Sequence, residues 1–392
     1  MAIPKFLAGL SANGKRIQSV GTPTAATDAA NKQYVDGMPQ YGVTNVAALQ
    51  PWYAKLNGHM SQVAKVLVTG DSISEGTGSS SMESVWPFRL QSLLRAKKGV
   101  AGGIGYATAY PTNGTIVTPA NFTRNGQQST DAWGLGGHSI MMSDPAHHLT
   151  YTNVVCDKIR VWYGKTDFLG GGIQVLIDGV DQSAGISSGN TVNADGFYWD
   201  SPALTPGPHT IVIKASSAFI GIVDGVEFFN GDSTKGIRVY NGAHFGWTAS
   251  SFLTTAIAMH WQQAVAMSPA LHVIYLGTND LIDSGTTPEQ FSSRIDSIIA
   301  KIPDIPVLLV GGFLRYDALG QAAKWNSMKA LLKAKATGRV AYVDLQLYWP
   351  DLTGNQYGGG LLTDGVHLGD PGAETVAQLM SSILSPDRPT PR

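Results

Sequence analysis

The chain has 392 residues, of which 43% are hydrophobic and only 14% are charged, and its formal net charge is −1. This length can hold two or three domains with at least one large core, and the near-neutral charge argues against a nucleic-acid-binding protein. The single cysteine, Cys156, excludes an intramolecular disulfide framework and a cysteine-based zinc site. We expect Cys156 to be a buried structural thiol, because it lies in an alternating apolar run.

No segment has the pattern of a membrane span or of a secretory signal. A span needs about 20 consecutive apolar residues, and no stretch approaches that length. Ala2–Leu10 is short and is broken by Pro4 and Lys5, so it does not predict a signal peptide. We therefore expect no membrane insertion.

The first part of the chain, residues 1–60, shows no clear helical or strand period. Within it, Asn13–Asp36 resembles a segment that recurs in bacteriophage tail-fibre and minor tail proteins, above all in its run Pro23–Asp36. The resemblance implies a tail-attachment segment, contact with other phage tail proteins and a location on the virion tail. The alternative interpretation is an ordinary flexible leader with a short helix from Thr27 to Val35.

An α/β pattern begins at about residue 61. Lys65–Gly70 is a short apolar run that ends in glycine, as is typical of a buried parallel strand. Helices and strands alternate from there, with a long interruption, and the expected elements are a helix at Val85–Lys98, a helix at Ser251–Met267, a strand at Leu271–Leu276, a helix that begins at the capping box Thr287–Gln290, a strand at Pro306–Val310, a helix at Gln321–Ala336, a strand at Val340–Leu345 and a helix that begins at Asp370. This alternation predicts a parallel sheet covered on both faces.

The interruption, residues 99–235, has an all-β pattern. Its short alternating runs are separated by turn signals and occur at Val154–Tyr163, Gly172–Ile177, His209–Lys214 and Ile220–Phe229. Because it splits the α/β series, we interpret it as an inserted β-sandwich or jelly-roll domain. The predicted α/β domain then comprises residues 61–98 and 236–385, and a Pro-rich tail follows at 386–392.

Polar residues follow two of the predicted parallel strands. Ser72 comes directly after the first strand, at the sheet edge where α/β folds bind their ligands. Asn279 comes after the strand at Leu271–Leu276, and its side-chain amide can donate to an oxyanion. Asp364 and His367 are three residues apart before the last helix, so the carboxylate can reach the imidazole. The other ring nitrogen is then free to accept the serine proton.

Together these motifs resemble the sequence blocks of the SGNH (GDSL-type) hydrolases, with Ile73 in place of the usual leucine after Ser72. The resemblance implies a flavodoxin-like three-layer α/β/α fold and a serine esterase with Ser72 as nucleophile and Asp364 and His367 as the rest of a triad. It implies an oxyanion hole formed by the Ser72 N–H, the Asn279 amide and a glycine N–H of the second block. The best match for that glycine is Gly246, in Asn241–Ala249, and the competing candidate is Gly242. The chemistry requires no cofactor and no metal.

Other polar residues have structural interpretations. His138 and His147–His148 suggest a metal site, but they lack carboxylates at ligand spacing apart from Asp144, so we favour a surface or structural role. We expect His244 to be packed or solvent-facing, Asp71 to anchor the serine loop by accepting backbone N–H bonds, and Asp280 to be a structural acceptor.

The SGNH hydrolases include lipases, thioesterases and carbohydrate esterases. The inserted β domain and the tail-like N-terminus favour an esterase that removes acyl groups, O-acetyl above all, from bacterial surface polysaccharide. One alternative is a non-catalytic receptor- or glycan-binding tail module, and another is a lipid esterase that acts on acyl chains of the cell envelope. Tail fibres are commonly trimers, so a homo-oligomer fits the resemblance, although no heptad or collagen-like repeat supports it.

Overall fold

The computed structural model describes residues 42–110, 119, 121–128, 133–167, 172–182, 186–187, 189, 191–216, 221–348 and 357–386. The tail-like segment Asn13–Asp36 and nearly all of the Pro-rich C-terminal tail lie outside the described residues. Within the described ranges, no helix is long and apolar enough to cross a membrane.

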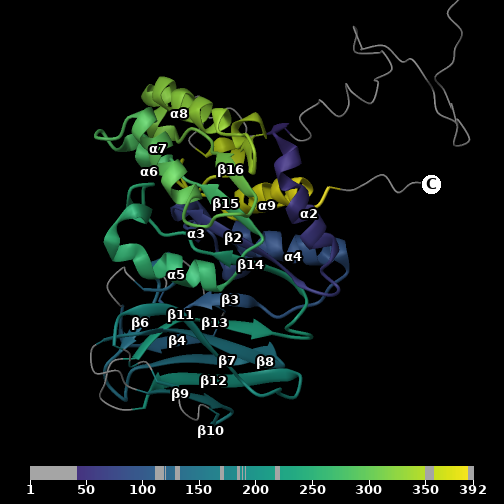
Figure 1. Cartoon of the computed structure of the whole chain (residues 1–392), viewed down its shortest axis with the longest axis vertical. Helices are drawn as coiled ribbons and strands as arrows, with labels where there is room; N and C mark the ends of the chain where they lie inside the picture. Colours follow the sequence, from purple (N-terminus) through teal and green to yellow (C-terminus); the bar gives the residue numbers. More distant parts are fainter. Residues whose placement is uncertain are drawn as a thin grey trace, which may run out of the picture. The chain divides into compact units, whose positions relative to one another are not determined.

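The α/β domain is built on a six-stranded sheet (Figure 1). Its spatial order is β1-β17-β16-β15-β2-β14, and its strands are β1 (Val43–Thr44), β2 (Val63–Gly70), β14 (Gly236–Asn241), β15 (Leu271–Tyr275), β16 (Val307–Gly311) and β17 (Val340–Asp344). All neighbouring pairs are parallel except β1 with β17. The direction in which strands are added reverses between β2 and β15, and open α/β sheets bind their ligands at such a switch point.

Helices cover both faces of this sheet, as the sequence predicts (Figure 1). Alternate residues of each strand point to opposite faces, so the apolar strands feed two cores. One core includes α2 (Gln50–Asn57), α4 (Trp86–Lys98) and α9 (Asp370–Leu384). The other includes α5 (Ala258–Ala266), α7 (Pro288–Ile299) and α8 (Ala322–Ala334). The expected three-layer α/β/α fold is confirmed.

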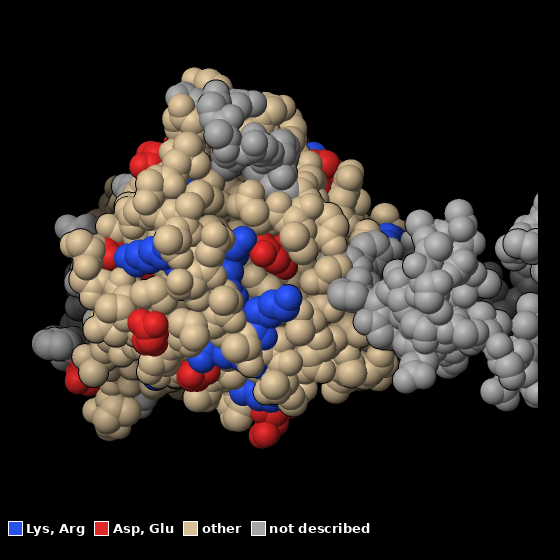
Figure 2. All heavy atoms as spheres, turned by 90° about the horizontal axis from the view of Figure 1, so that it is seen from above, with Lys and Arg blue, Asp and Glu red and all other residues tan. Residues whose placement is uncertain are grey.

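The face of α7 and α8 carries basic side chains flanked by acidic ones (Figure 2). Lys335 forms an ion pair with Asp296 at 2.6 Å, and the Nζ of Lys324 donates to backbone carbonyls at the end of the short helix α6 (Thr278–Ile282). Through these contacts Lys335 and Lys324 stabilise the helical layer.

Two boundaries differ from the sequence-based expectation. The sequence places the start of the α/β domain at residue 61, whereas β1 already pairs with β17, and Trp52 on α2 is fully buried, with its indole N–H 2.8 Å from the Leu384 carbonyl. A two-residue strand and an eight-residue helix are too short to show a hydrophobic period. The helix expected from Ser251 begins only at Ala258, after two short 3₁₀ turns.

A β-sandwich is inserted between α4 and β14, as expected. Its two antiparallel sheets share one core and have the orders β10-β9-β12-β7-β4 and β11-β8-β13-β6-β5, with β3 also paired to β13. The strands are β3 (Gly105–Thr108), β4 (Phe122–Asn125), β5 (Gln127–Gln128), β6 (Ile140–Met142), β7 (His148–Cys156), β8 (Lys158–Lys165), β9 (Ile173–Ile177), β10 (Val180–Asp181), β11 (Ala194–Asp200), β12 (Gly207–Ala215) and β13 (Gly221–Phe229).

The run Val154–Tyr163, expected as one strand, is divided between two. The chain crosses from one sheet to the other at Asp157, whose N–H donates to the Phe229 carbonyl at 2.8 Å. Cys156 lies just before this crossing and is fully buried, which confirms the structural thiol. Burial raises the pKa of its thiol to about 12.

Candidate active site

Ser72 is the first residue of a one-turn helix, α3 (Ser72–Glu75), that follows β2 directly. The Asp71 carboxylate caps this helix by accepting a 3.1 Å hydrogen bond from the Ile73 N–H, so its expected anchoring role is confirmed. A Cβ on Gly70 would lie 2.5 Å from the Ser74 hydroxyl, so only glycine fits this exit from the strand. Burial raises the pKa of Asp71 to about 7.

The structure brings Ser72, Asp364 and His367 together. The Ser72 Oγ lies 2.9 Å from His367 Nε2, and His367 Nδ1 lies 2.7 Å from Asp364 Oδ2. The other carboxylate oxygen, Oδ1, accepts from the N–H groups of Val366 at 3.0 Å and His367 at 2.8 Å. This is the order of contacts that a hydroxyl, an imidazole and an orienting carboxylate need for nucleophilic catalysis.

Solvent exposure increases along the triad from Ser72 to Asp364. Ser72 is 3% exposed, whereas the side chains of His367 and Asp364 are 16% and 54% exposed. Partial burial raises the pKa of Asp364, but hydrogen bonds from the His367 imidazole and from two backbone N–H groups outweigh it, so the pKa lies below its usual value. Asp364 is therefore a carboxylate at neutral pH.

The two candidate oxyanion glycines differ in what their N–H groups do. The Gly242 N–H donates to the Val68 carbonyl at 2.8 Å and continues the sheet ladder. Gly246 is exposed, has a φ of 75°, and a Cβ there would meet nothing within 4 Å. No residue in the described part of the chain accepts from the N–H of Gly246 or of Ser72. The geometry thus favours Gly246 over Gly242, and its role as an oxyanion donor stays a prediction.

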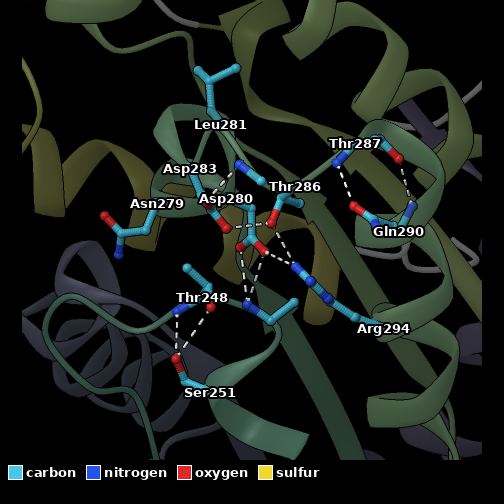
Figure 3. Close-up of polar contacts among 12 residues, drawn as sticks. Thr248, Ser251, Asn279, Asp280, Leu281, Asp283, Thr286, Thr287, Gln290 and Arg294 are labelled. Atoms are coloured by element: carbon cyan, nitrogen blue, oxygen red, sulfur yellow. Dashed lines mark hydrogen bonds and ion pairs between the residues drawn. The ribbon is translucent and has the colours of Figure 1, made fainter.

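Asn279 and Asp280 are adjacent residues of α6 with separate contacts. The Asn279 amide donates to the Trp247 carbonyl at 2.9 Å, which ties it to the loop that carries Gly246. Figure 3 shows the Asp280 carboxylate directed away from Asn279, toward the Ala249 N–H at 3.0 Å and Arg294 at 3.7 Å. Asp280 is thus the structural acceptor that the sequence predicts, and burial raises its pKa to about 6.

His138 and the pair His147–His148 do not form the metal site that their residue types suggest. His147 accepts from the Ser143 N–H, and His148 donates to the Ala146 carbonyl. His138 is buried elsewhere and stacks on His244, which is also buried, so the expectation of a packed His244 is confirmed. Among the described residues, no three His, Cys, Asp or Glu side chains are grouped as metal ligands would be.

Two contacts at the triad were not foreseen from the sequence. The Phe245 ring stacks near the His367 imidazole, with centroids 6.2 Å apart and planes 21° apart. The Tyr316 N–H donates to the Gly365 carbonyl at 2.9 Å and thereby fixes the turn between Asp364 and His367. The position of Phe245 beside Gly246 was the only sequence signal for the first contact, and the second has none.

The comparisons with known proteins agree with this geometry. The model of the family described as GDSL-like Lipase/Acylhydrolase matches residues 175–380, more than half of the chain. This range includes Gly246, Asn279, Asp364 and His367 and leaves out Ser72. No curated protein matches the chain significantly.

A solved structure shows the same fold at low sequence identity, and two others match more loosely. A structure titled "Peptidoglycan O-acetylesterase in action, 5 min" is 16% identical, covers 87% of this chain and 97% of its own, and superposes with a TM-score of 0.64. A two-domain esterase active on acetylated mannans is 11% identical over 90% of this chain and 60% of its own, with a TM-score of 0.43. A family two carbohydrate esterase from Clostridium thermocellum, in complex with cellohexaose, is 14% identical over 67% and 97%, with a TM-score of 0.29. The last two superpose too loosely to support an argument.

Proposed function

The chain belongs to the GDSL-like lipase/acylhydrolase family, and from this premise we propose that it is a serine esterase that removes O-acetyl groups from bacterial surface polysaccharide. The observation that carries the esterase chemistry is the chain of contacts from the Ser72 hydroxyl through His367 to the Asp364 carboxylate. Each group lies within hydrogen-bond distance of the next, as proton transfer during attack requires.

The proposed reaction is acyl transfer to water. His367 Nε2 accepts the Ser72 proton while Oγ attacks the ester carbonyl carbon, and the carbonyl oxygen becomes an oxyanion. The Ser72 and Gly246 N–H groups and the Asn279 amide donate to that oxygen, and one such donor typically contributes on the order of 3 kcal/mol to transition-state stabilisation.

Asp364 stabilises the imidazolium that forms, and His367 then returns the proton to the alcohol that leaves. Water, deprotonated in turn by His367, attacks the acyl-serine ester and releases the carboxylic acid, and His367 gives this proton to the Ser72 oxygen as it leaves. Every proton that moves in these two steps passes through His367 Nε2.

Two observations support a glycan substrate. The chain carries a β-sandwich inserted between the strands that lead to Ser72 and to Gly246. In the structure this domain contacts the loop that carries Gly246, because His244 donates to the Gly136 carbonyl. The fold likeness to a protein titled as a peptidoglycan O-acetylesterase extends over 97% of that protein. A glycan ester as substrate rests on this analogy of fold and on the inserted domain.

We further propose that the chain is a component of a phage tail, in contact with other tail proteins. The support is the wording of Pro23–Asp36, which resembles segments of tail-fibre and minor tail proteins. A virion-borne esterase would meet surface polysaccharide during adsorption, which joins the two proposals.

The test compares the wild type with Ser72→Ala, and with Ser61→Ala as a matched control on the exposed turn that precedes β2, at the end of that strand opposite to Ser72. We expect the wild type and Ser61→Ala to hydrolyse p-nitrophenyl acetate, and Ser72→Ala to be inactive. Acetate release from purified surface polysaccharide, with the same variants, tests the substrate. A folded but inactive wild type would instead indicate a glycan-binding module, and a preference for palmitoyl over acetyl esters would indicate a lipid esterase.

A further inference from the structure

A segment of the inserted domain, Trp133–Ser139, lies directly against the loop that carries Gly246. His244 Nδ1 lies 2.5 Å from the Gly136 carbonyl oxygen, and His138 Nε2 lies 2.9 Å from the Ala243 carbonyl oxygen. Because a carbonyl only accepts, both ring nitrogens carry the hydrogen. One hydrogen bond thus runs in each direction between the inserted domain and the loop.

The same two histidines belong to a stack of three rings. His138 and His244 have centroids 4.8 Å apart and planes 3° apart, and His244 and Trp247 have centroids 4.0 Å apart and planes 16° apart. His138 and His244 are 1% and 6% exposed. Gly246 lies between His244 and Trp247 in the sequence, so the stack fixes the chain on both sides of it.

Both ends of the segment are anchored in the β-sandwich. The Gly134 N–H donates to the Asp195 carboxylate of β11 at 2.8 Å, and the Ser139 hydroxyl donates to the Asp224 carboxylate of β13 at 2.7 Å. Both carboxyls are buried. Burial raises the pKa of Asp224 well above its usual value, and the charge of Asp195 raises it further.

Gly136, in the middle of the segment, packs closely against the loop that carries Gly246. A Cβ on Gly136 would lie 2.6 Å from the Ala243 carbonyl oxygen, and Gly136 has a φ of 71°. Its N–H donates to His260 Nδ1 at 2.8 Å, and burial lowers the pKa of His260 to about 3, which keeps that imidazole neutral and able to accept. Glycine is thus required here on both steric and conformational grounds.

We infer that His138 and His244 are positioning residues for catalysis: through them the inserted domain holds the Gly246 N–H where the oxyanion forms. The inference rests on the proposed esterase function. Neither imidazole is in the triad. Oxyanion donors are effective only when they are already in place, and a displacement of 1 Å costs on the order of 100-fold in rate.

The experiment uses the full chain and p-nitrophenyl acetate, so that it does not depend on the natural glycan. His138→Leu and His244→Leu remove the donors, whereas His138→Gln and His244→Asn keep an N–H near Nε2 and Nδ1. We expect the leucine variants to lose about 10- to 100-fold in kcat with KM changed less than about 3-fold. The amide variants should regain most of kcat.

A phenylboronic acid, which forms a tetrahedral adduct with a serine, gives a second readout. The adduct resembles the transition state, so its affinity should fall by the same factor as kcat. Substrate binding should not change, because the donor acts only on the oxyanion. His148→Leu is the control and should match the wild type, because this side chain lies in the same domain and donates to the local Ala146 carbonyl. All rates are divided by the folded fraction from circular dichroism.

A double-mutant cycle with Gly246→Ala tests whether the two histidines act through the Gly246 N–H. Alanine at Gly246 meets no neighbour but is strained at a φ of 75°, so it displaces the N–H itself. If the histidines act through that N–H, the double variant should be hardly slower than Gly246→Ala alone. If a leucine variant does not fold, His244→Gln, which shifts the donor by one methylene, replaces it and should also lower kcat.

Wild-type kcat and boronic-acid affinity in these variants, or full additivity with Gly246→Ala, would overturn the inference while leaving the esterase proposal intact. A wild type without any esterase activity would overturn both.

Discussion

Replacement of Asp364 by asparagine tests the electrostatic part of the proposed mechanism. In the transition state a carboxylate faces an imidazolium, with charge centres about 4 Å apart, which gives about 4 kcal/mol at an effective dielectric constant of 20 and about 1 kcal/mol in water. The Asp364 side chain is 54% exposed, so the value should lie between these limits. We expect a loss of about 2–3 kcal/mol, on the order of 30- to 150-fold in kcat.

The asparagine also has one oxygen for two tasks. In the wild type, Oδ1 accepts from two backbone N–H groups while Oδ2 accepts from His367 Nδ1. The amide must either lose the hydrogen bonds from the two backbone N–H groups or present its NH₂ to the imidazole. The second arrangement favours the wrong tautomer of His367. This adds to the electrostatic loss.

The assay measures kcat for p-nitrophenyl acetate at pH 8, with Asp232→Asn, which is 48% exposed, as a control of similar exposure. Because the pKa of Asp364 is lowered, its carboxylate and the stability it contributes are present at this pH and are lost only as the pH falls through that lowered value. A rate equal to that of the wild type would show that Asp364 has no catalytic role. A loss as complete as that of Ser72→Ala would refute the argument from solvent exposure.

Two further predictions concern the turn after β2. Burial raises the pKa of Asp71 to about 7, so the folded state keeps a proton that the unfolded state loses near pH 4. The free energy of unfolding should therefore fall by up to about 4 kcal/mol as the pH rises from 4 to 7. In urea titrations, Asp71→Asn should remove this contribution. If the pH dependence of Asp71→Asn equals that of the wild type, the burial argument is wrong. A Cβ on Gly78, at a φ of 93°, would lie 2.6 Å from the Leu368 carbonyl oxygen and 3.3 Å from the His367 Cβ. Gly78→Ala should shift the His367 loop and lower kcat by roughly 10- to 100-fold in steady-state assays, and a normal kcat would show that the loop accommodates it.

The positions of the triad residues were predictable because each depends on a local rule. Ser72 follows a buried strand, so its place at the carboxyl edge of the sheet follows from the strand alone. Asp364 and His367 are close in sequence, and the positive φ of Gly365 between them turns the carboxylate back to the imidazole. Such relations can be read from a short window of residues.

The support of the oxyanion loop could not be predicted in this way. His138 and His244 looked like unrelated histidines, because their stacking depends on how a β-sandwich meets an α/β domain. The strand β1 and the sheet crossing at Asp157 were missed for a related reason. A two-residue strand and a one-residue crossing have no hydrophobic period, and only long-range pairing with β17, β12 and β13 defines them.

The insertion also has a consequence for how the chain folds during synthesis. β14 pairs in parallel with β2, with Ile237 opposite Ala64, yet the whole β-sandwich is translated between them. About 170 residues separate Ser72 from Gly246, which corresponds to roughly 10–35 s at usual translation rates. During that time both edges of β2 are without their partners β14 and β15, and the contact that closes the sheet is of high contact order and therefore slow. Early folding of the β-sandwich brings the ends of this long loop together, so the rate at which β14 docks should depend on the folding rate of the inserted domain.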